Sequence, residues 1–435
     1  HYSLAPASGR LHPPPYPPNA FFLHHRTSMA HELHDNLMDL ILVRVPCKVD
    51  RASISLVCRA WRDKVARLGG QAPPPLPWLL LPSRFGNDPT FRAACVLSGC
   101  SVHPQHNLLT TMPPGARFVG SYDGAWNFLY FGETRRHRLF NARTRQVRKL
   151  PLGIYVNRDG HQTICIMVIL AATLSSSPDD SMCVGAAIIA RDQGPHEVLQ
   201  PYNRWIALWR MGWEMAVELD MVDMGMYLAE DVVYHCRARA FYFLLIHGVS
   251  YEILVCTPNA NPEDPGDLTI NFNGRRFLPL ALEERISPLH SVIARYLVVS
   301  RGELLMVVRI KAVADQQTCE FKVFRAKRRP QMPDYHHYPV AQYPWEWSDL
   351  DTLDGRILFV GYGCSRSYQA DAYPGFKPGI YFLDDGMFYE ALYFGGANTR
   401  PYPCTDNGMW SEGRIQRCFP TPNSSDYSPP VWLLP

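Results

Sequence analysis

The N-terminal part of the chain has hydrophobic residues at the spacing of an α-helix, in two successive stretches between residues 33 and 68. The first stretch contains Leu37, Leu40, Ile41 and Val45, and the second contains Ile54, Val57, Cys58, Trp61 and Val65. Members of each set lie three, four, seven, eight or eleven positions after the first one, which places them on one face of a helix. The pattern therefore predicts a short helical module with an apolar face.

Residues that end or begin helices separate the two stretches. Pro46 ends the first, because proline lacks an amide donor and restricts the residue before it. Asp50 is the predicted N-cap of the second stretch, and Gly69–Gly70 end it. The 36 residues from 33 to 68 fall below the roughly 40 at which a domain commonly folds without help. We therefore expect another surface to cover the apolar face of this module.

The pattern changes to that of a β protein after residue 70. Short runs rich in Val, Ile, Tyr, Phe and Trp alternate with Gly, Asn, Asp and Pro, and the 38 prolines disfavour long helices. The clearest set of strands has turns at Tyr122–Gly124 and Asn141–Ala142, and its strands are Arg117–Val119, Trp126–Phe131, His137–Asn141 and Val147–Leu150. Four strands in about 35 residues are what one propeller blade requires.

Similar sets of strands follow at irregular intervals. Residues 231–259 and 296–327 each predict three strands, with turns near His247–Gly248 and Arg301–Gly302, and further strands are predicted between 348 and 386. The expected fold is therefore mainly β: a short N-terminal helical module followed by a β-propeller-like domain. A pair of β-sandwiches is the alternative architecture.

Composition and charge narrow the classes of function. Hydrophobic residues make up 47% and charged residues 19% of the chain, which is enough apolar material for a large core, and the net charge is only +3. This balance indicates no nucleic-acid partner and no membrane surface. The longest apolar run, Thr163–Leu174, is shorter than the ~20 residues of a membrane-spanning helix and predicts a buried strand. The basic run at 325–330 is interpreted as a loop between strands rather than a nuclear-import signal.

The sequence offers weak candidates for a metal site. Twelve scattered cysteines without a Cys-x-x-Cys pair suit a reducing compartment. One group has ligand types that suit zinc, but its spacing matches no common closed site: Cys95, Cys100, His103 and His106. A second group invites comparison with the copper ligands of propeller oxidases: Tyr362, Cys364, Tyr368 and His336–His337. Neither spacing specifies a site, so we predict no metal and no cofactor.

Other signatures of catalysis are weaker still. Asp384–Asp385 and the three aspartates at 349, 351 and 354 occur where turns favour Asp, and the latter set lacks the terminal glutamate of a calcium loop. The sequence contains no glycine-rich phosphate loop and no Gly-x-Ser-x-Gly elbow. We therefore expect a protein that binds rather than an enzyme.

The helical module contains a hydrophobic-Pro step at Val45–Pro46 and, after it, the segment LVCRAWRDKV, Leu56–Val65. Both features resemble the F-box: the segment is similar to the second half of the family's signature, and the step corresponds to its hydrophobic-Pro step. The resemblance implies binding to the Skp-type adaptor of a cullin ubiquitin ligase. As a hypothesis, the adaptor covers a face formed by Leu37, Leu40, Ile41, Val45, Pro46, Val57 and Trp61. The alternative is a helical cap that packs on its own domain.

Four further segments of the chain are distinctive: SRGELLMVVRI (300–310), FKVFRA, LFVGYGCSRSYQADAYPGFKPGIYFLDD (358–385) and SPPVWLLP (428–435). Through these segments, residues 78–435 resemble the large plant family of F-box proteins that carry a KIB-type β-propeller. The resemblance implies a substrate-recognition subunit of an SCF-type ligase in the cytoplasm or nucleus, whose propeller binds a target protein. A stand-alone propeller binding protein and, less favoured, a propeller oxidase remain the alternatives.

These observations divide the chain into four parts. Residues 1–30 are predicted to be a disordered extension, with Met29 as a candidate natural start; residues 31–68 form the F-box module, 69–77 a proline-rich linker and 78–435 the propeller. Loops that join blade strands, such as Tyr122–Ala125 and Arg366–Pro374, are candidate contact sites for the target, because binding residues gather on loops held by a rigid scaffold.

Overall fold

The computed structural model describes residues 35–45, 48–68, 75–84, 92–96, 113, 115–158, 161–192, 204–219, 227–260, 264, 268–313, 317–330, 338–373, 376–385, 402–419 and 424–435. The chain forms two compact units, His1–Pro74 and Pro75–Pro435. We call them the helical unit and the propeller. None of the helices in the described part of the chain has the length and hydropathy needed to cross a bilayer.

The helical unit contains three short helices, α1 (Asp35–Val43), α2 (Lys48–Ser55) and α3 (Arg59–Leu68). The second predicted stretch is therefore two helices, because the chain turns at Leu56–Cys58. Asp50 lies in the first turn of α2 rather than before it, so its assignment as N-cap was wrong. An acidic residue in that turn still interacts favourably with the helix dipole.

The core of the helical unit is small. Its buried residues are Met38, Leu42 and Trp61, and the partly buried Ile54, Cys58, Ala60 and Val65 pack around them. Lys64 Nζ in α3 lies 2.9 Å from Asp39 Oδ2 in α1 and ties these two helices together. Met38 and Leu42 are one helical turn apart, so the inner face of α1 differs from the predicted Leu37–Leu40–Ile41 face.

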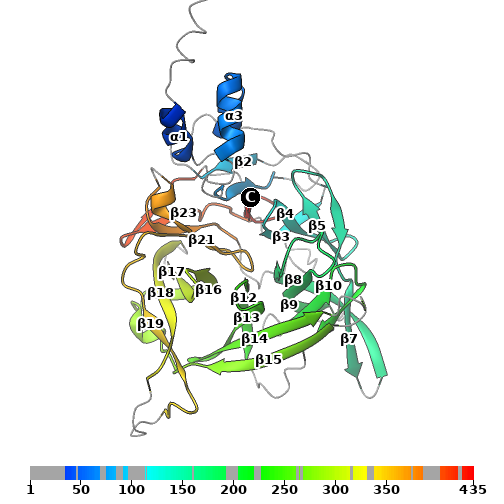
Figure 1. The fold of residues 1–435 in the computed structure, drawn as a ribbon. Helices are drawn as coiled ribbons and strands as arrows, with labels where there is room; N and C mark the ends of the chain where they lie inside the picture. Colours follow the sequence, from blue (N-terminus) through cyan, green and yellow to red (C-terminus); the bar gives the residue numbers. More distant parts are fainter. Residues whose placement is uncertain are drawn as a thin grey trace, which may run out of the picture. The chain divides into compact units, whose positions relative to one another are not determined.

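The propeller contains five sheets of four or five strands in its described residues, arranged like the blades of a propeller (Figure 1). The first sheet has strands β3 (Ala116–Tyr122), β4 (Trp126–Phe131), β5 (Arg136–Asn141) and β6 (Val147–Lys149), joined in sequence order. All four predicted strands of this blade are confirmed. Ala142 N bonds to Ala125 O at 2.9 Å, which fastens two of its turns to each other.

The second sheet closes on itself. Its strands are β7 (Gly153–Arg158), β8 (His161–Leu174), β9 (Val184–Asp192), β10 (Trp205–Arg210) and β11 (Met215–Glu218). They pair antiparallel in sequence, and β11 also pairs with β7 in parallel. The apolar run Thr163–Leu174 lies in β8. The predicted burial is confirmed from Met167 to Leu174, whereas Thr163 and Ile164 are exposed.

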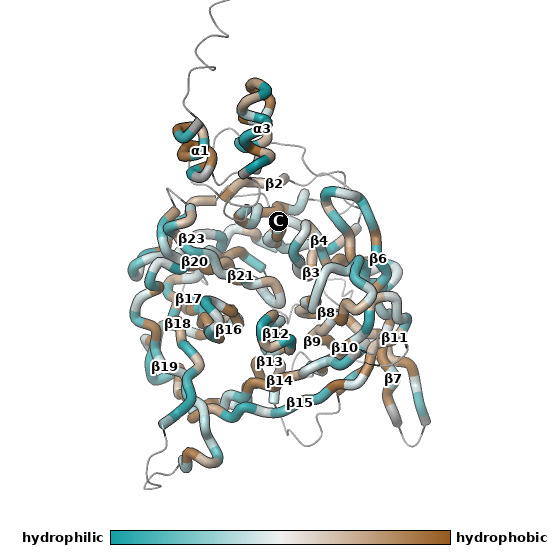
Figure 2. Tube along the Cα trace, viewed as in Figure 1, coloured by the Kyte–Doolittle hydropathy of each residue, from teal (hydrophilic) through white to brown (hydrophobic). Residues whose placement is uncertain are grey.

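The third and fourth sheets are regular four-stranded blades. The third has β12 (Leu228–His235), β13 (Ala240–His247), β14 (Ser250–Ala260) and β15 (Leu268–Arg276); the fourth has β16 (His290–Ser300), β17 (Glu303–Ala312), β18 (Thr318–Arg328) and β19 (Trp345–Asp349). The first three strands of each were predicted, and the fourth was not. Figure 2 shows the difference between the hydrophobic β9 and the outer strand β15, in which hydrophilic residues are frequent.

The basic run at 325–330 is the end of a strand and not the predicted loop. Its first four residues belong to β18 and pair with β19, where Lys327 lies opposite Glu346. Arg325 Nη1 also bonds to Glu303 Oε1 at 3.1 Å, and Arg329 Nη1 donates to the carbonyls of Tyr338 and Tyr343. Strand pairing and these bonds hold the basic side chains to the fourth sheet.

The fifth sheet is irregular, and a small sheet joins the two ends of the propeller. The fifth contains β20 (Arg356–Phe359), β21 (Arg366–Gln369), β22 (Gly379–Phe382), β23 (Gly408–Ser411) and β24 (Arg414–Gln416), with a parallel pair β20–β22. The small sheet contains β1 (Trp78–Leu81), β2 (Arg92–Cys95) and β25 (Val431–Leu433). The segment SPPVWLLP is thus a closing strand, and Trp432 Nε1 bonds to Val360 O in the fifth sheet at 2.8 Å.

The blades pack on one another around the centre. Strand β8 lies beside β3 and β12, and β16 lies beside β12 and β21. The largest hydrophobic cluster draws residues from the second, third, fourth and fifth sheets, including Phe243, Tyr296 and Leu358. Because each sheet contacts neighbours on two sides, the arrangement is a propeller and not a pair of sandwiches.

Candidate functional site

The five inner strands lead to one cavity at an end of the propeller. It has a volume of about 350 Å³, and we call it the mouth cavity. Its lining comes from every blade. The residues are Tyr122 at the end of β3 and Asp123 after it, Thr173 and Leu174 of β8, residues 233–237 of β12 and its turn, Val299 of β16 and Gly302 of the β16–β17 turn, and residues 365–367 at the start of β21. Its volume lies within the range of small-ligand and side-chain pockets.

An ion pair crosses the mouth cavity between the first and fifth sheets. Arg366 Nε lies 2.9 Å from Asp123 Oδ1, and the guanidinium lies over the ring of Tyr122, 5.9 Å from its centroid. Burial alone would lower the pKa of Arg366, but the Asp123 carboxylate raises it above the ordinary value. The two candidate contact loops of the sequence analysis therefore meet here. Residues 366–369 of the second loop are strand β21 rather than loop.

The turn between β12 and β13 supplies an exposed cation to the same cavity. Arg237 and Cys236 are exposed, whereas His235 is buried and its Nδ1 accepts a hydrogen bond from Ala238 N at 3.2 Å. Arg237 Nη1 lies over Gly302, where a Cβ would come within 2.9 Å of it. Gly302 has φ of 81°, a conformation in which glycine is at no disadvantage. Within the described residues, no carboxylate lies at ion-pair distance from Arg237.

A buried carboxylate ties the inner strands together. Asp231 Oδ1 accepts hydrogen bonds from Val232 N at 2.8 Å and Gly363 N at 2.7 Å, and Oδ2 accepts one from Leu297 N at 2.7 Å. Burial raises the pKa of Asp231 to about 8, although the three N–H donors act to lower it. Gly363 has φ of 70°, and a Cβ there would lie 2.4 Å from Ala172 O. These contacts fix the third, fourth and fifth sheets relative to β8.

A second buried polar cluster joins the fourth and fifth sheets. Arg309 donates from Nε to Thr318 Oγ1 at 2.7 Å, from Nη2 to Asp406 Oδ2 at 2.8 Å and from Nη1 to Asp385 Oδ1 at 3.2 Å. The Tyr296 hydroxyl donates to Asp385 Oδ2 at 3.1 Å. Burial raises the pKa of Asp385 to about 7, which outweighs the opposing effect of Arg309. The aspartate pair considered as catalytic carboxylates therefore contributes Asp385 to an internal salt-bridge network.

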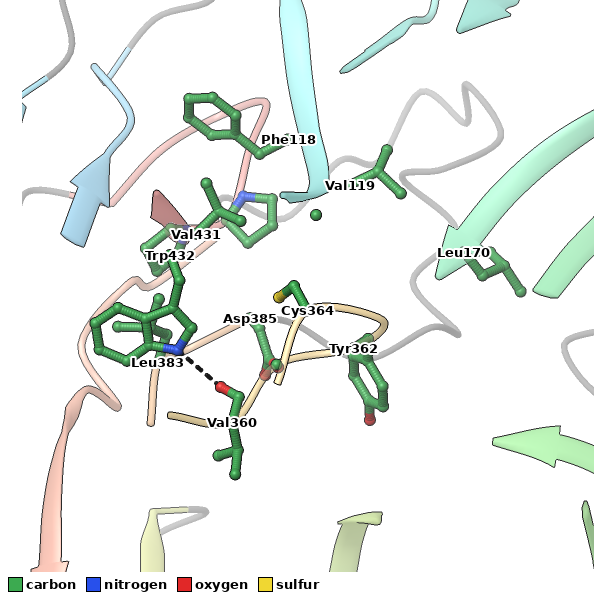
Figure 3. Close-up of a pocket in the computed structure, with 14 residues that line it drawn as sticks. Phe118, Val119, Leu170, Val360, Tyr362, Cys364, Leu383, Asp385, Val431 and Trp432 are labelled. Carbon is green, nitrogen blue, oxygen red and sulfur yellow. Dashed lines mark hydrogen bonds between the residues drawn. The ribbon is translucent and has the colours of Figure 1, made fainter. Parts of the chain in front are cut away.

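The residues compared with copper ligands are core residues where the structure describes them. Figure 3 shows Tyr362 and Cys364 in the lining of a cavity of about 30 Å³, room for a water molecule or two. Tyr362 packs against Tyr296 with the ring centroids 5.0 Å apart and the rings tilted by 44°. Burial raises the pKa of Cys364 to about 12, so its thiol stays protonated. Residues 100, 103, 106, 336 and 337 lie outside the described part of the chain, and within it no three His, Cys, Asp or Glu side chains cluster as metal ligands do.

The aspartates at 349, 351 and 354 line a groove of about 510 Å³ between the fourth and fifth sheets. Asp349 is paired with Arg285 at 2.9 Å, and Asp354 is paired with Arg301 at 2.5 Å and lies 3.6 Å from Arg356. Trp410 lies in the same groove and packs against Phe321. Because two of these carboxylates are already neutralised, we regard the groove as a weaker candidate than the mouth cavity.

The predicted adaptor-binding residues fall into three groups. Leu37, Leu40 and Ile41 lie on the outer face of α1 with 45%, 51% and 37% exposure, and Val57 in the turn after α2 is 61% exposed. Trp61 is instead part of the internal core, and Val45 is partly buried. Pro46 lies outside the described residues. Sequence reasoning missed Leu56, which is 76% exposed beside Val57, although it begins the LVCRAW segment that was singled out.

Comparison with known proteins gives one clear result. The model of the KIB1-4 beta-propeller family matches residues 100–409, which include every strand from β3 to β22. No curated protein matches the chain. The match covers well over half of the chain and coincides with the blades described above.

Proposed function

The chain belongs to the KIB1-4 beta-propeller family, and from this we propose that it is the target-recognition subunit of an SCF-type cullin ubiquitin ligase. In this proposal the helical unit is an F-box that docks on a Skp-type adaptor, and the propeller binds the target protein. A β-propeller is consistent with protein binding. Ubiquitin transfer belongs to other subunits, so this chain contributes proximity and no catalytic group.

One observation carries the proposal: the helical unit leaves its large hydrophobic side chains exposed. Leu37, Leu40, Ile41, Leu56 and Val57 are each at least 37% exposed, while the unit's own core has three buried residues. Burying one such side chain contributes on the order of 1.5–3 kcal/mol. A partner that covers several of them gains enough free energy for a stable complex, even after the cost of association.

The F-box resemblance supports a Skp-type adaptor as the partner. The exposed residues belong to the segments that resemble the F-box, namely α1 and the start of LVCRAWRDKV. Trp61 supports the same assignment in another way, because it holds α3 against α1 from the inside and so presents the outer face to the adaptor. An adaptor from a plant, and through it a cullin, is the partner we propose, in the cytoplasm or nucleus.

The test is co-purification of the full chain with a plant Skp-type adaptor after co-expression. We expect the double substitution Leu40→Asp and Leu56→Asp to abolish the complex, because two carboxylates would be desolvated in an apolar interface. Asn36→Asp is the matched control: it introduces the same charge at an exposed position of α1 and should leave the adaptor bound. Retention of the adaptor by the double variant would refute the proposed docking face.

The same experiment separates the alternative, a propeller that binds its target without a ligase. In that case the wild-type chain would purify without the adaptor although the propeller is folded. Thermal unfolding of the propeller gives the required check, since the two substitutions lie in the helical unit and should not change it.

A further inference from the structure

The residues that line the mouth cavity carry more positive charge than negative charge. Its lining includes two arginines and one carboxylate, and that carboxylate, Asp123, is engaged by Arg366. Arg237 is the surplus cation, exposed and without a carboxylate partner among the described residues. Arg239, two residues further along the same turn, is also exposed and adds positive charge next to the cavity.

Two tyrosine hydroxyls of the mouth cavity are also available to donate hydrogen bonds. Tyr122 and Tyr234 line the cavity, and neither hydroxyl is hydrogen-bonded to another side chain or carbonyl within the described residues. Burial raises the pKa of both phenols, so each remains a neutral donor at physiological pH. An anionic group that enters the cavity would accept hydrogen bonds from these hydroxyls and from the Arg237 guanidinium, and charge-assisted bonds of that kind are the stronger ones.

The lining is preorganised for such a guest. Arg366 and Asp123 are fixed by their ion pair, and His235 is held by Ala238 N. Arg301, in the β16–β17 turn, has φ of 53° and bonds through Nε to Gln369 Oε1 at 3.0 Å, so the turn that supports Arg237 is tied to the fifth sheet. A side chain that binds here therefore meets a lining of which part is already fixed, which lowers the entropy cost of binding.

From these observations we propose that the mouth cavity binds an acidic segment of the target protein, with a Glu or Asp carboxylate held by Arg237 and the hydroxyls of Tyr122 and Tyr234. This rests on the proposed function of the propeller as a target receptor. A carboxylate matches the single surplus cation of the lining, whereas a doubly charged phosphate would call for a second free guanidinium. The volume of about 350 Å³ admits one or two side chains of an extended segment rather than a folded domain.

Fluorescence anisotropy on the full-length chain tests the proposal with three labelled decapeptides. In each, glycine alternates with a second residue, which is glutamate, glutamine or phosphoserine. We expect the glutamate peptide to bind at least about tenfold more tightly than the glutamine peptide, and its affinity to fall as salt rises. Equal binding of these two peptides, or binding of the phosphoserine peptide alone, would overturn the acidic-segment assignment.

Matched arginine variants locate the site. Arg237→Gln should weaken binding of the glutamate peptide about five- to tenfold, and Arg414→Gln, at an exposed arginine outside the mouth cavity, should not change it. Equal effects of the two substitutions would show a nonspecific charge effect and refute the site. Adaptor co-purification of the wild-type chain is measured in parallel. A wild-type chain that holds the adaptor but binds no acidic peptide overturns this inference alone, and one that binds the peptide without the adaptor overturns only the ligase assignment.

Discussion

The helical unit and the propeller distribute their hydrophobic residues in opposite ways. In the described part of the helical unit, three hydrophobic residues are buried, and Leu40 and Leu56 are more than half exposed. In the propeller, clusters such as the one around Phe243 and Tyr296 draw side chains from four sheets and bury them completely. The first arrangement leaves apolar surface that the proposed adaptor would cover, whereas the second buries its apolar side chains within the propeller itself.

Under the two proposals above, this difference determines how each unit would recognise its partner. The helical unit offers apolar area, so its binding free energy comes from burial and depends weakly on salt. The propeller offers charge and hydrogen-bond donors at Arg237, Tyr122 and Tyr234. Its affinity for a target segment should therefore depend on the charge of that segment and on ionic strength. Substitutions that act on one unit should therefore leave the other unchanged.

The largest effect is expected in the propeller from Asp231→Ala. The change leaves three buried N–H groups, those of Val232, Leu297 and Gly363, without their acceptor, at about 1–3 kcal/mol each where water does not replace it. The free energy of unfolding of the propeller should fall by about 3–5 kcal/mol, measured by urea unfolding. Asp351→Ala, at an exposed carboxylate, is the control. Asp231→Ala should still bind the adaptor, because the change lies in the propeller. Loss of adaptor binding in this variant would contradict the independence of the two units.

Trp61→Ala should have the next largest effect, and it should act only on the helical unit. Removing a buried Trp from a core of three residues costs about 3 kcal/mol, comparable to the whole stability expected of so small a unit. Limited proteolysis should then cleave between residues 48 and 68 much faster than in the wild type. Arg62→Ala, at an exposed position of α3, should cleave at the wild-type rate. Leu40→Asp should lose the adaptor without faster cleavage, which distinguishes the outer face from the inner one.

A smaller effect is expected from pH, and it should appear in the propeller. The folded-state pKa of Asp231 is raised to about 8 and that of Asp385 to about 7, both above the unfolded value of about 4. Between the unfolded and the folded-state pKa values, the folded state therefore holds more protons than the unfolded state. The free energy of unfolding falls as pH rises through this range, by about 1 kcal/mol per pH unit for each group still protonated in the folded state.

Buried His137 acts in the opposite direction at lower pH. Burial lowers its pKa to about 3, whereas the unfolded-state value is about 6.5. The stability that depends on a neutral His137 is therefore lost as pH falls below about 6.5. Urea unfolding at pH 7 and pH 8 isolates the aspartates, because His137 is then largely neutral in both states. Asp385→Asn should reduce the slope between these pH values. A propeller that is equally stable at pH 7 and pH 8 would contradict this prediction.

The smallest effect on stability is expected from Val57→Ser. Because Val57 is 61% exposed, the free energy of unfolding of the helical unit should change by less than about 0.5 kcal/mol. Adaptor affinity should still fall several-fold, since one apolar contact is lost, and titration by surface plasmon resonance would measure it. Unchanged affinity would place Val57 outside the interface and restrict the docking face to α1 and Leu56.

Local patterns in the sequence were sufficient to predict much of the fold. The hairpins β3–β6 and the first three strands of the third and fourth sheets follow from alternation and turn residues, such as Arg301–Gly302. Strand β15 was missed because Asn271, Asn273 and Gly274 look like turn residues, and they are tolerated at an exposed sheet edge. The sequence could not predict that Trp61 is buried and Leu56 exposed, since both belong to the same apolar segment. Their side chains face different surroundings only because the chain turns at Leu56–Cys58.

The site depends on pairings that no local pattern contains. Arg366 and Asp123 are 243 residues apart, and the Asp231 carboxylate reaches Gly363 across 132 residues. The sequence pointed to loops at both ends of the first pair because binding residues gather on loops that join the strands of a rigid scaffold. It could not indicate that they converge, because convergence results from the order in which five sheets close around the centre.

The pairing of β1 with β25 has a consequence for synthesis of the protein. Leu80 lies opposite Val431, and Leu79 opposite Trp432, so the ring stays open until some 350 further residues have been translated. At about 5–20 residues per second this interval lasts roughly 20–70 seconds, during which β1 presents a hydrophobic strand edge to the crowded surroundings of the ribosome. The helical unit is made before that interval begins, so an adaptor that captures it early would hold a nascent chain whose receptor domain is still unclosed.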